Sequence, residues 1–158
     1  MVLEKKFKIF YLFIILLCVS SIFYAFFVEY ILGYKPCILC KYQRVPYILG
    51  LIIGLFGFLK PSNTKISIYL FFTFLISMTL SGYHVGIEQE LYQSMLNCSD
   101  DNFSILEEGK LLESLSVINP DCRNVNFAVF GVSLATINFV LSFVISSVSY
   151  YLYSYAKN

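Results

Sequence analysis

The residues with the clearest chemistry are Cys37 and Cys40, in the segment Lys35-Pro-Cys-Ile-Leu-Cys-Lys-Tyr-Gln-Arg44. At the start of a helix, the helix dipole and nearby cations lower the pKa of a thiol and favour the reactive thiolate. Both influences are expected here, because Lys41 is adjacent to Cys40 and Arg44 follows it by one helical turn. The Cys-x-x-Cys spacing therefore predicts a redox-active dithiol. A structural disulfide or half of a zinc site are the alternatives that the spacing leaves open.

A second pair, Cys98 and Cys122, encloses 23 residues of mostly polar sequence. A disulfide between them would stabilise the fold by roughly 3.5 kcal/mol in the chain-entropy model, so a purely structural bond is an open alternative. If both pairs face the same oxidising compartment, they can exchange electrons by thiolate attack through mixed disulfides. The fifth cysteine, Cys18, lies within an apolar run and is predicted to be a small buried apolar residue.

Two further side chains can act at a bound cofactor. The positive charge of Arg44 can stabilise an anionic cofactor or the Cys40 thiolate, and the alternative is a cation that extends to the lipid headgroups. His84 lies near the end of an apolar run and can donate a proton or a hydrogen bond to a bound ring. The alternative for His84 is an ordinary hydrogen-bonding residue at the membrane interface.

The elements that position these residues are apolar enough to cross a membrane. Apolar residues make up 58% of the 158 residues and charged residues 13%, against about 25% charged in an ordinary globular domain. The second apolar run, 45–59, is short, and it spans the hydrocarbon only if its helix begins near Cys40; a re-entrant segment is the alternative. We predict an all-α membrane protein in one domain, a four-helix transmembrane bundle with helices at about residues 9–28, 40–59, 66–87 and 127–155.

Four spans place both termini on the same side of the membrane. Lysines in the first eight residues, in the loop after the second helix and at the end of the chain predict that this side is cytoplasmic: Lys5, Lys6, Lys8, Lys60, Lys65 and Lys157. Lys35, Lys41 and Arg44 in the first outer loop oppose this assignment. The run 9–28 is too long for a signal peptide and has no cleavage site after it, so we expect a retained helix. A net charge of +1 gives no indication of nucleic-acid binding.

The outer segments are then residues 29–39 and 88–126. Within the longer one, residues 103–118 mix leucine, isoleucine and phenylalanine with charged residues in a partly amphipathic pattern. This pattern predicts a short helix on the membrane surface, with a polar loop as the alternative.

Taken together, these motifs resemble the disulfide bond formation protein B family (DsbB), including its close relative DsbI. The shared features are Pro36-Cys-Ile-Leu-Cys-Lys-Tyr-Gln-Arg44, a Gly82-Tyr-His84 end to the third helix, and a cysteine on each side of an outer loop. Phe127 followed by Gly131-Val-Ser133 is similar to the family's entry into the fourth helix, although the family often has tryptophan at the Phe127 position. Vitamin K epoxide reductase relatives carry their loop pair before the Cys-x-x-Cys, and here it follows.

The resemblance implies an enzyme, a thiol oxidase of the bacterial inner membrane. It would reoxidise a periplasmic thioredoxin-like protein of the DsbA type and pass the electrons to ubiquinone or menaquinone, supporting disulfide formation in exported proteins. The partner's thiolate would attack Cys98 and release Cys122, which would attack Cys37 and free Cys40 to meet the quinone. Arg44 and His84 would bind the quinone. Three alternatives remain. The first is an oxidase dedicated to one partner, as in DsbI; the second is a metal-binding membrane protein; the third is a non-enzymatic protein whose disulfides are structural.

Overall fold

The computed structural model describes residues 2–89, 91, 128–129 and 131–157. Its helices are α1 (Val2–Tyr30), α2 (Ile38–Tyr42), α3 (Arg44–Leu59), α4 (Lys65–Glu88) and α6 (Leu134–Lys157), and its strands are β1 (Ala128–Val129) and β2 (Val132–Ser133). Cys98, Cys122 and the predicted surface helix at 103–118 lie outside the described residues.

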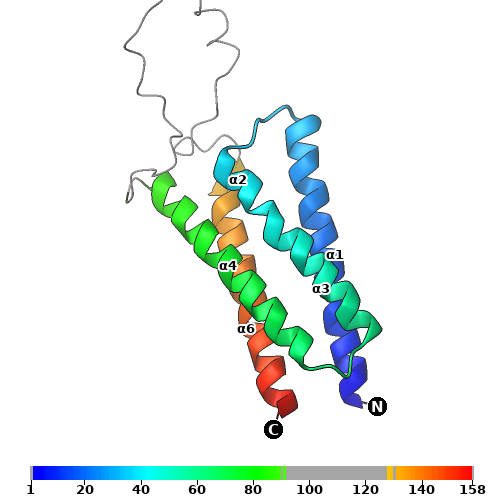
Figure 1. Cartoon of the computed structure of the whole chain (residues 1–158). Coiled ribbons are helices and arrows are strands. Elements are labelled where there is room, and N and C mark those ends of the chain that lie inside the picture. The colour runs from blue at the N-terminus through cyan, green and yellow to red at the C-terminus, as the bar shows by residue number, and fades with distance from the viewer. Residues whose placement is uncertain (1, 90, 92–127, 130, 158) are drawn as a thin grey trace, which may run out of the picture.

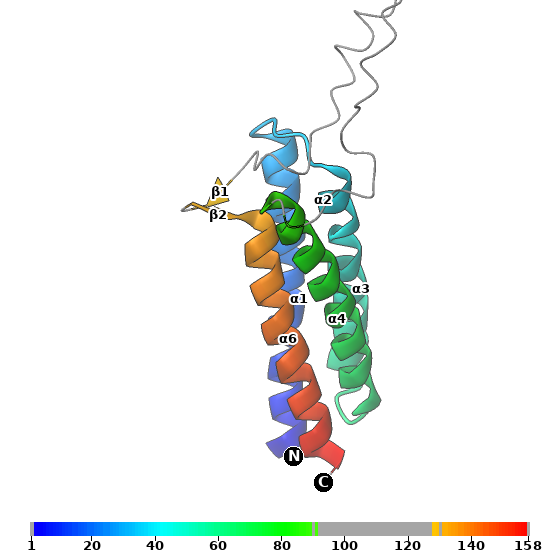
Figure 2. The ribbon, with the colours of Figure 1, turned by 90° about the vertical axis from the view of Figure 1, so that its left-hand side faces the viewer.

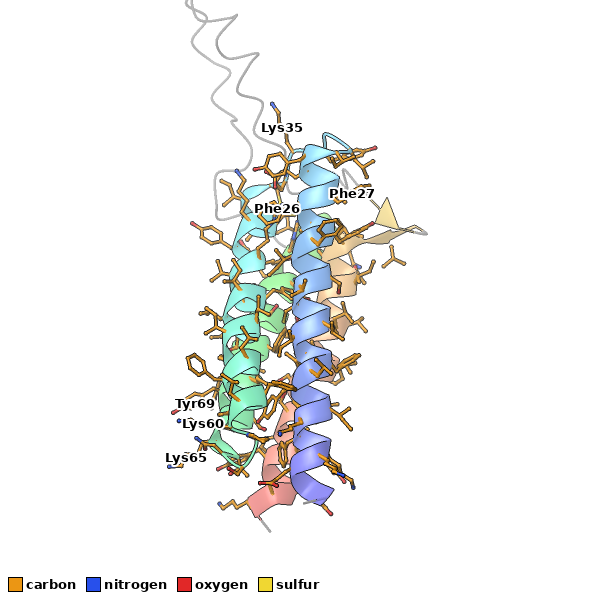
Figure 3. The ribbon with its side chains drawn as sticks, turned by 90° about the vertical axis from the view of Figure 1, so that its right-hand side faces the viewer. Phe26, Phe27, Lys35, Lys60, Lys65 and Tyr69 are labelled. Carbon is orange, nitrogen blue, oxygen red and sulfur yellow. The ribbon has the colours of Figure 1, made fainter. Side chains whose placement is uncertain are left out.

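Helices α1, α3, α4 and α6 run along the long axis of the molecule, and α2 continues the line of α3 (Figure 1). Within the described residues, four helices are long and apolar enough to cross a membrane: Glu4–Tyr30, Ile38–Leu59, Lys65–Glu88 and Leu134–Lys157. This finding confirms the predicted all-α class and the four-helix transmembrane bundle. The outward faces carry large apolar side chains, as a lipid environment requires (Figure 3).

Both termini lie at one end of the bundle, and the connection from α1 to α2 lies at the other (Figure 1). Lys60 and Lys65 lie toward the end that carries the termini, whereas Lys35 lies at the opposite end (Figure 3). Cations at both ends flank the apolar band, as expected for residues at the two membrane surfaces.

Glycines allow α3 to approach α1 closely. A Cβ atom added to Gly57 would lie 2.6 Å from the Tyr11 ring, and one added to Gly54 would lie 3.2 Å from the side chain of Ile15. Tyr11 is fully buried and its hydroxyl lies 3.0 Å from Ser67 Oγ on α4, so the ring has little room to move. Small residues at helix contacts are the usual solution in membranes, where van der Waals packing drives association.

Serines fill the corresponding contact between α4 and α6. Ser77 and Ser81 on α4 and Ser142 and Ser146 on α6 are buried, and the Ser142 hydroxyl lies 2.9 Å from Ser77 Oγ. Because a serine side chain is small, the two helices pack closely, and the hydroxyls of these four serines bond one another or backbone carbonyls of α4.

The second span is divided between two helices. Pro46 has no N–H and cannot bond the Tyr42 carbonyl, so α2 ends at Tyr42 and α3 begins at Arg44, with Gln43 between them. Cys37 is the N-cap of α2, and its sulfur accepts a hydrogen bond from the Cys40 backbone N–H at 3.4 Å. The cysteine pair therefore occupies the first turn of a helix, as predicted.

The fourth transmembrane helix begins later than residue 127, so that part of the prediction was wrong. Strands β1 and β2 form an antiparallel hairpin that projects beside the bundle (Figure 2). Gly131 in the turn has a φ of 80°, which glycine adopts without strain. The helix then starts at Leu134, because Ser133 Oγ accepts the Thr136 backbone N–H at 3.2 Å and caps it.

Candidate functional site: a buried dithiol beside a cavity

The two cysteines of the Cys-x-x-Cys motif lie side by side as thiols. Their Sγ atoms are 3.2 Å apart, with Cys37 donating to Cys40. Cys37 is 5% exposed and Cys40 is half-buried. Their separation leaves only a small movement of the side chains between the dithiol and a disulfide.

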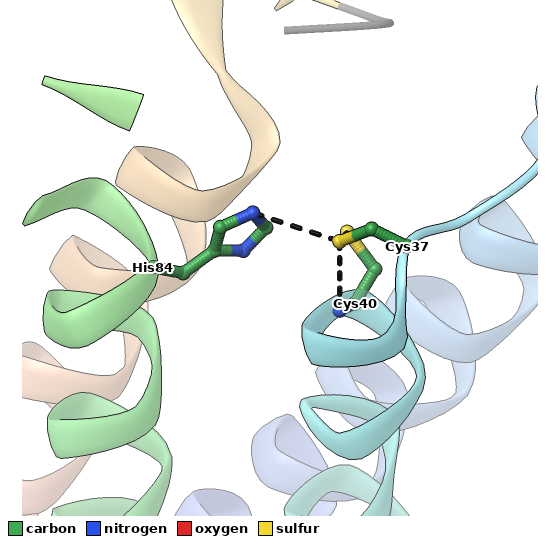
Figure 4. Close-up of side chains that lie close together, drawn as sticks. All are labelled: Cys37, Cys40 and His84. Atoms are coloured by element: carbon green, nitrogen blue, oxygen red, sulfur yellow. Dashed lines mark hydrogen bonds between the residues drawn. The ribbon is translucent and has the colours of Figure 1, made fainter. Parts of the chain in front are cut away.

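His84 on α4 faces this pair across the bundle (Figure 4). Its Nε2 atom lies 3.7 Å from Cys37 Sγ, and the residue is 3% exposed. The same nitrogen lies 3.7 Å from Glu88 Oε1, one turn further along α4. The bundle therefore brings together one imidazole, one carboxylate and two thiols from segments almost 50 residues apart.

The Cys37 thiol does not have the lowered pKa that its place at a helix start suggests. The hydrogen bond with Cys40 and burial together raise its pKa to about 12, and the hydrogen bond with His84 opposes this rise. α2 has only five residues, so the dipole it offers is small. In the dithiol, Cys37 therefore keeps its proton near neutral pH and donates it toward the sulfur of Cys40, which is the acceptor of the pair.

Arg44 is held by α1. Its Nη1 atom is 2.5 Å from Glu29 Oε2, and its guanidinium carbon lies 5.2 Å from the centre of the Phe26 ring. Both side chains of the ion pair are about one-fifth exposed. The carboxylate offsets the positive charge that the sequence led us to expect at the cofactor or at Cys40, and nothing in the sequence motifs pointed to Glu29.

A cavity of about 590 Å³ lies against the dithiol. Its wall includes Cys37, Cys40, Arg44, His84 and Glu88, and it is completed by mostly apolar side chains of α1, α3 and α6. Pockets for organic cofactors commonly have volumes of about 300–1,000 Å³ and apolar walls with a few polar groups. The cavity thus unites the four predicted site residues that the structure describes.

The cysteines and the histidine also satisfy the distance criterion for a metal site. One ligand atom from each of Cys37, Cys40 and His84 lies within 4.8 Å of the others. Two sulfurs and an imidazole nitrogen are a ligand set that zinc favours. The zinc alternative raised by the sequence is therefore geometrically feasible at this place.

The polar side chains that support His84 were not predicted from the sequence. Gln43 Nε2 lies 3.0 Å from His84 Nδ1, and Asn138 Nδ2 donates to Gln43 Oε1 at 2.9 Å. The available signal was an asparagine within the apolar run 127–155, because polar side chains inside a membrane span are costly and usually have a partner.

These observations define a membrane-spanning protein whose dithiol opens onto an apolar cavity. The chain belongs to the family of disulfide bond formation protein DsbB, whose model matches residues 7–152. It is therefore a multi-pass membrane protein that takes part in disulfide bond formation. The family consists of disulfide oxidoreductases.

Individual relatives agree with this assignment. The chain is 25% identical over 128 residues to disulfide bond formation protein B of Xylella fastidiosa, covering 75% of this chain and 73% of the relative. It is 24% identical over 130 residues to the protein of the same name from Polaromonas naphthalenivorans, covering 78% and 77%. An uncharacterized protein of Rickettsia prowazekii, RP370, is 27% identical over 145 residues, covering 88% and 83%.

Proposed function

We propose that the protein is a quinone-coupled thiol oxidase of the bacterial inner membrane. It reoxidises a periplasmic thioredoxin-like protein of the DsbA type and passes the electrons to ubiquinone or menaquinone. The observation that carries this proposal is the half-buried Cys40 in the wall of a mostly apolar 590 Å³ cavity within a membrane bundle. Membership of the family supports it.

The cavity has the chemistry that a quinone ring requires. Its apolar wall suits the ring and the start of an isoprenoid tail, Arg44 offers N–H groups for a ring oxygen, and His84 lines the same wall beside the dithiol. When bound, a quinone supplies an acceptor for two electrons and two protons. A partner of the DsbA type has a potential near about −120 mV, so its reoxidation needs a strong acceptor of this kind.

The thiol steps balance without any further reagent. A partner thiolate attacks Cys98 and displaces Cys122, and the second partner thiol then resolves that mixed disulfide, so the partner leaves oxidised. Cys122 attacks Cys37 in the Cys37–Cys40 disulfide and releases Cys40 as a thiolate, and Cys98 resolves this second mixed disulfide. The loop disulfide is restored, and the Cys37–Cys40 dithiol holds two electrons and two protons.

The same proposal assigns the sides of the membrane. The end that carries the termini also carries Lys60 and Lys65, so we place it in the cytoplasm and both cysteine pairs in the periplasm (Figure 3). Labelling of Cys37 and Cys98 by an impermeant thiol reagent in intact and in inverted vesicles tests this placement.

Quinone-dependent oxidation of a reduced thioredoxin-like partner tests the function. We expect Cys40→Ser and Cys98→Ser to lose turnover, and Cys18→Ala to keep it, because Cys18 is fully buried and does not line the cavity. Full turnover by both serine variants would contradict the relay.

A metal-binding protein is the second candidate, favoured by the cluster of Cys37, Cys40 and His84. Elemental analysis of reduced protein purified without chelator distinguishes the two candidates. Stoichiometric zinc that is lost in His84→Ala would favour the metal site, whereas its absence together with partner oxidation favours the oxidase.

A further inference from the structure

A chain of buried polar side chains joins α6 to His84 through the break between α2 and α3. The Tyr47 hydroxyl contacts Asn138 Oδ1 at 2.5 Å, Asn138 Nδ2 contacts Gln43 Oε1 at 2.9 Å, and Gln43 Nε2 contacts His84 Nδ1 at 3.0 Å. All four residues are less than one-tenth exposed. Each contact joins a different pair of structural elements, so the chain is a tertiary feature and not a local turn.

The atoms in contact give this chain a direction. Asn138 Oδ1 lies against the Tyr47 hydroxyl and also accepts from Ser142 Oγ at 3.2 Å, and an amide oxygen can only accept. The phenol of Tyr47 therefore donates to the carbonyl oxygen of Asn138, and the Asn138 amide nitrogen faces Gln43. Gln43 accepts with its oxygen and must present its own NH₂ group to His84.

The direction of the chain decides which imidazole nitrogen carries the proton. Because Gln43 donates to Nδ1, that nitrogen is the acceptor, and a neutral imidazole then carries its hydrogen on Nε2. Nε2 is the atom that lies 3.7 Å from both Cys37 Sγ and Glu88 Oε1. The donor thus points at the sulfur and toward the cavity.

We propose that Gln43, Asn138 and Tyr47 are positioning residues that hold His84 in the Nε2–H tautomer, so that it donates a hydrogen bond to the Cys37 sulfur. The tautomer itself follows from the contacts above, whereas its role in turnover rests on the proposed function. A fixed donor at this place stabilises negative charge on Cys37 when the mixed disulfide at Cys37 is resolved, without any rearrangement at that moment.

The tautomer also separates this proposal from the metal site. Zinc bound to His84 at the dithiol would need a lone pair on Nε2, and the hydrogen would then move to Nδ1. That state requires Gln43 and Asn138 to turn both amides over and leaves the Tyr47 hydroxyl facing an NH₂ group. The two hypotheses therefore predict opposite protonation of the same two nitrogens.

His84 is the only histidine in the sequence, so labelling with ¹⁵N-histidine reports on one residue. We would record ¹⁵N spectra of the reduced full-length protein at about pH 8, where a free imidazole is neutral. The expected result is a protonated Nε2 and an unprotonated Nδ1. A protonated Nδ1 with a bare Nε2 would overturn the proposal, with or without added zinc.

Two substitutions test the chain itself. In Gln43→Glu an ionised carboxylate can only accept, so we expect Nδ1 to become protonated. In Asn138→Leu the anchor of Gln43 is lost, and we expect both tautomers to be populated. A wild-type spectrum in both variants would overturn the proposal, because the chain would then have no influence on His84.

Ser146→Ala is the matched control on α6, since Ser146 is buried on the same helix but bonds the Phe71 carbonyl instead of Asn138. We expect it to keep the wild-type spectrum; a changed spectrum would show that any loss of polarity in α6 shifts the tautomer and would overturn the specific role. If Asn138→Leu does not fold, Gln43→Met removes the donor at His84 by itself and is expected to populate both tautomers.

Turnover distinguishes this inference from the proposed function. We expect Asn138→Leu to lower thiol oxidation severalfold and Ser146→Ala to leave it unchanged. If the protein oxidises no partner at all but the spectra follow the predictions, the oxidase fails while the tautomer stands. If oxidation is normal in Asn138→Leu although the tautomers are mixed, the role assigned to the Nε2 donor is wrong.

Discussion

The two ends of the bundle are built on different principles. Toward the termini, α3 and α1 meet through Gly54 and Gly57, and Tyr11 fills the remaining space. At the other end the same helices border a 590 Å³ cavity, and the polar residues there, such as His84 and Gln43, bond one another. One end holds the helices together, and the other leaves room for a ligand beside a reactive pair.

From this difference we predict which property of the protein a substitution at each end should change. Changes at the closely packed end should alter stability and leave the chemistry of the folded protein intact. Changes at the cavity end should alter thiol chemistry at a smaller cost in stability, because the helices there are separated by space and hydrogen bonds and not by tight contact.

The largest expected effect is the loss of activity in Cys37→Ala. Without this sulfur the inner pair cannot form a disulfide, so partner oxidation should fall by about 10³-fold or more. Cys18→Ala removes a fully buried cysteine that does not line the cavity, and it should retain activity. Turnover with a reduced partner measures both, and an active Cys37→Ala would remove the inner pair from the mechanism.

The second largest expected effect is a low rate of alkylation of Cys37 in the dithiol, caused by its raised pKa. Its pKa is raised to about 12, so at every pH below 12 less thiolate is present than for an ordinary thiol. Compared with a thiol of pKa about 9, alkylation at pH 8 should be roughly 10³-fold slower and should keep rising tenfold per pH unit toward pH 12. Mass spectrometry of alkylated Cys37 across about pH 7–11 gives the profile. A rate that levels off near pH 9 would contradict the raised pKa.

At the packed end, Gly57→Ala should destabilise the protein. The new Cβ would lie 2.6 Å from a Tyr11 ring that is fully buried and bonded to Ser67, so overpacking should cost about 1–3 kcal/mol. Gly54→Ala is the milder comparison, since its Cβ would lie 3.2 Å from Ile15 Cγ1 and 3.6 Å or more from Ile14 and the Tyr11 carbonyl oxygen. Thermal unfolding in detergent should show a lower Tm for Gly57→Ala, with partner oxidation unchanged well below that Tm. A Tm of Gly57→Ala equal to that of the wild type would show that the close approach is not required.

How much of this contrast was predictable depends on how local each feature is. The four spans follow from long apolar runs, and the division between α2 and α3 follows from Pro46, because both are properties of neighbouring residues. The hairpin before α6 was missed, since residues 127–133 are as apolar as the helix they precede. The raised pKa of Cys37 was missed because it comes from burial and from Cys40 in three dimensions.

The polar partners were unpredictable for a similar reason. Arg44 could be recognised as a cation, but its pairing with Glu29 brings together two separate helices. The contact of Asn138 with Gln43 joins residues 95 positions apart, and no spacing in the sequence encodes it. The cysteines and His84 were identifiable because their chemistry is intrinsic to the residue type, whereas their supports depend on the fold.

The smallest expected effect concerns the ion pair of Arg44 and Glu29. It tests whether this pair acts mainly on ligand binding, as expected at the cavity end, and only weakly on stability. Glu29→Gln keeps the size of the side chain but leaves Arg44 without its carboxylate, and because the pair is about one-fifth exposed, the loss of stability should be about 1 kcal/mol. The guanidinium then has the Phe26 ring and a neutral amide beside it in place of a carboxylate, so we expect the apparent affinity for a quinone to change severalfold while Tm falls little.

A double-mutant cycle with Arg44→Gln separates the two contributions. If the carboxylate acts only through Arg44, adding Glu29→Gln to Arg44→Gln should have no further effect on quinone affinity. An additive effect would mean that Glu29 contacts the ligand itself. A Tm loss in Glu29→Gln as large as that in Gly57→Ala would mean that the ion pair, like the glycine contact, chiefly holds the helices together, and the distinction between the two ends would fail.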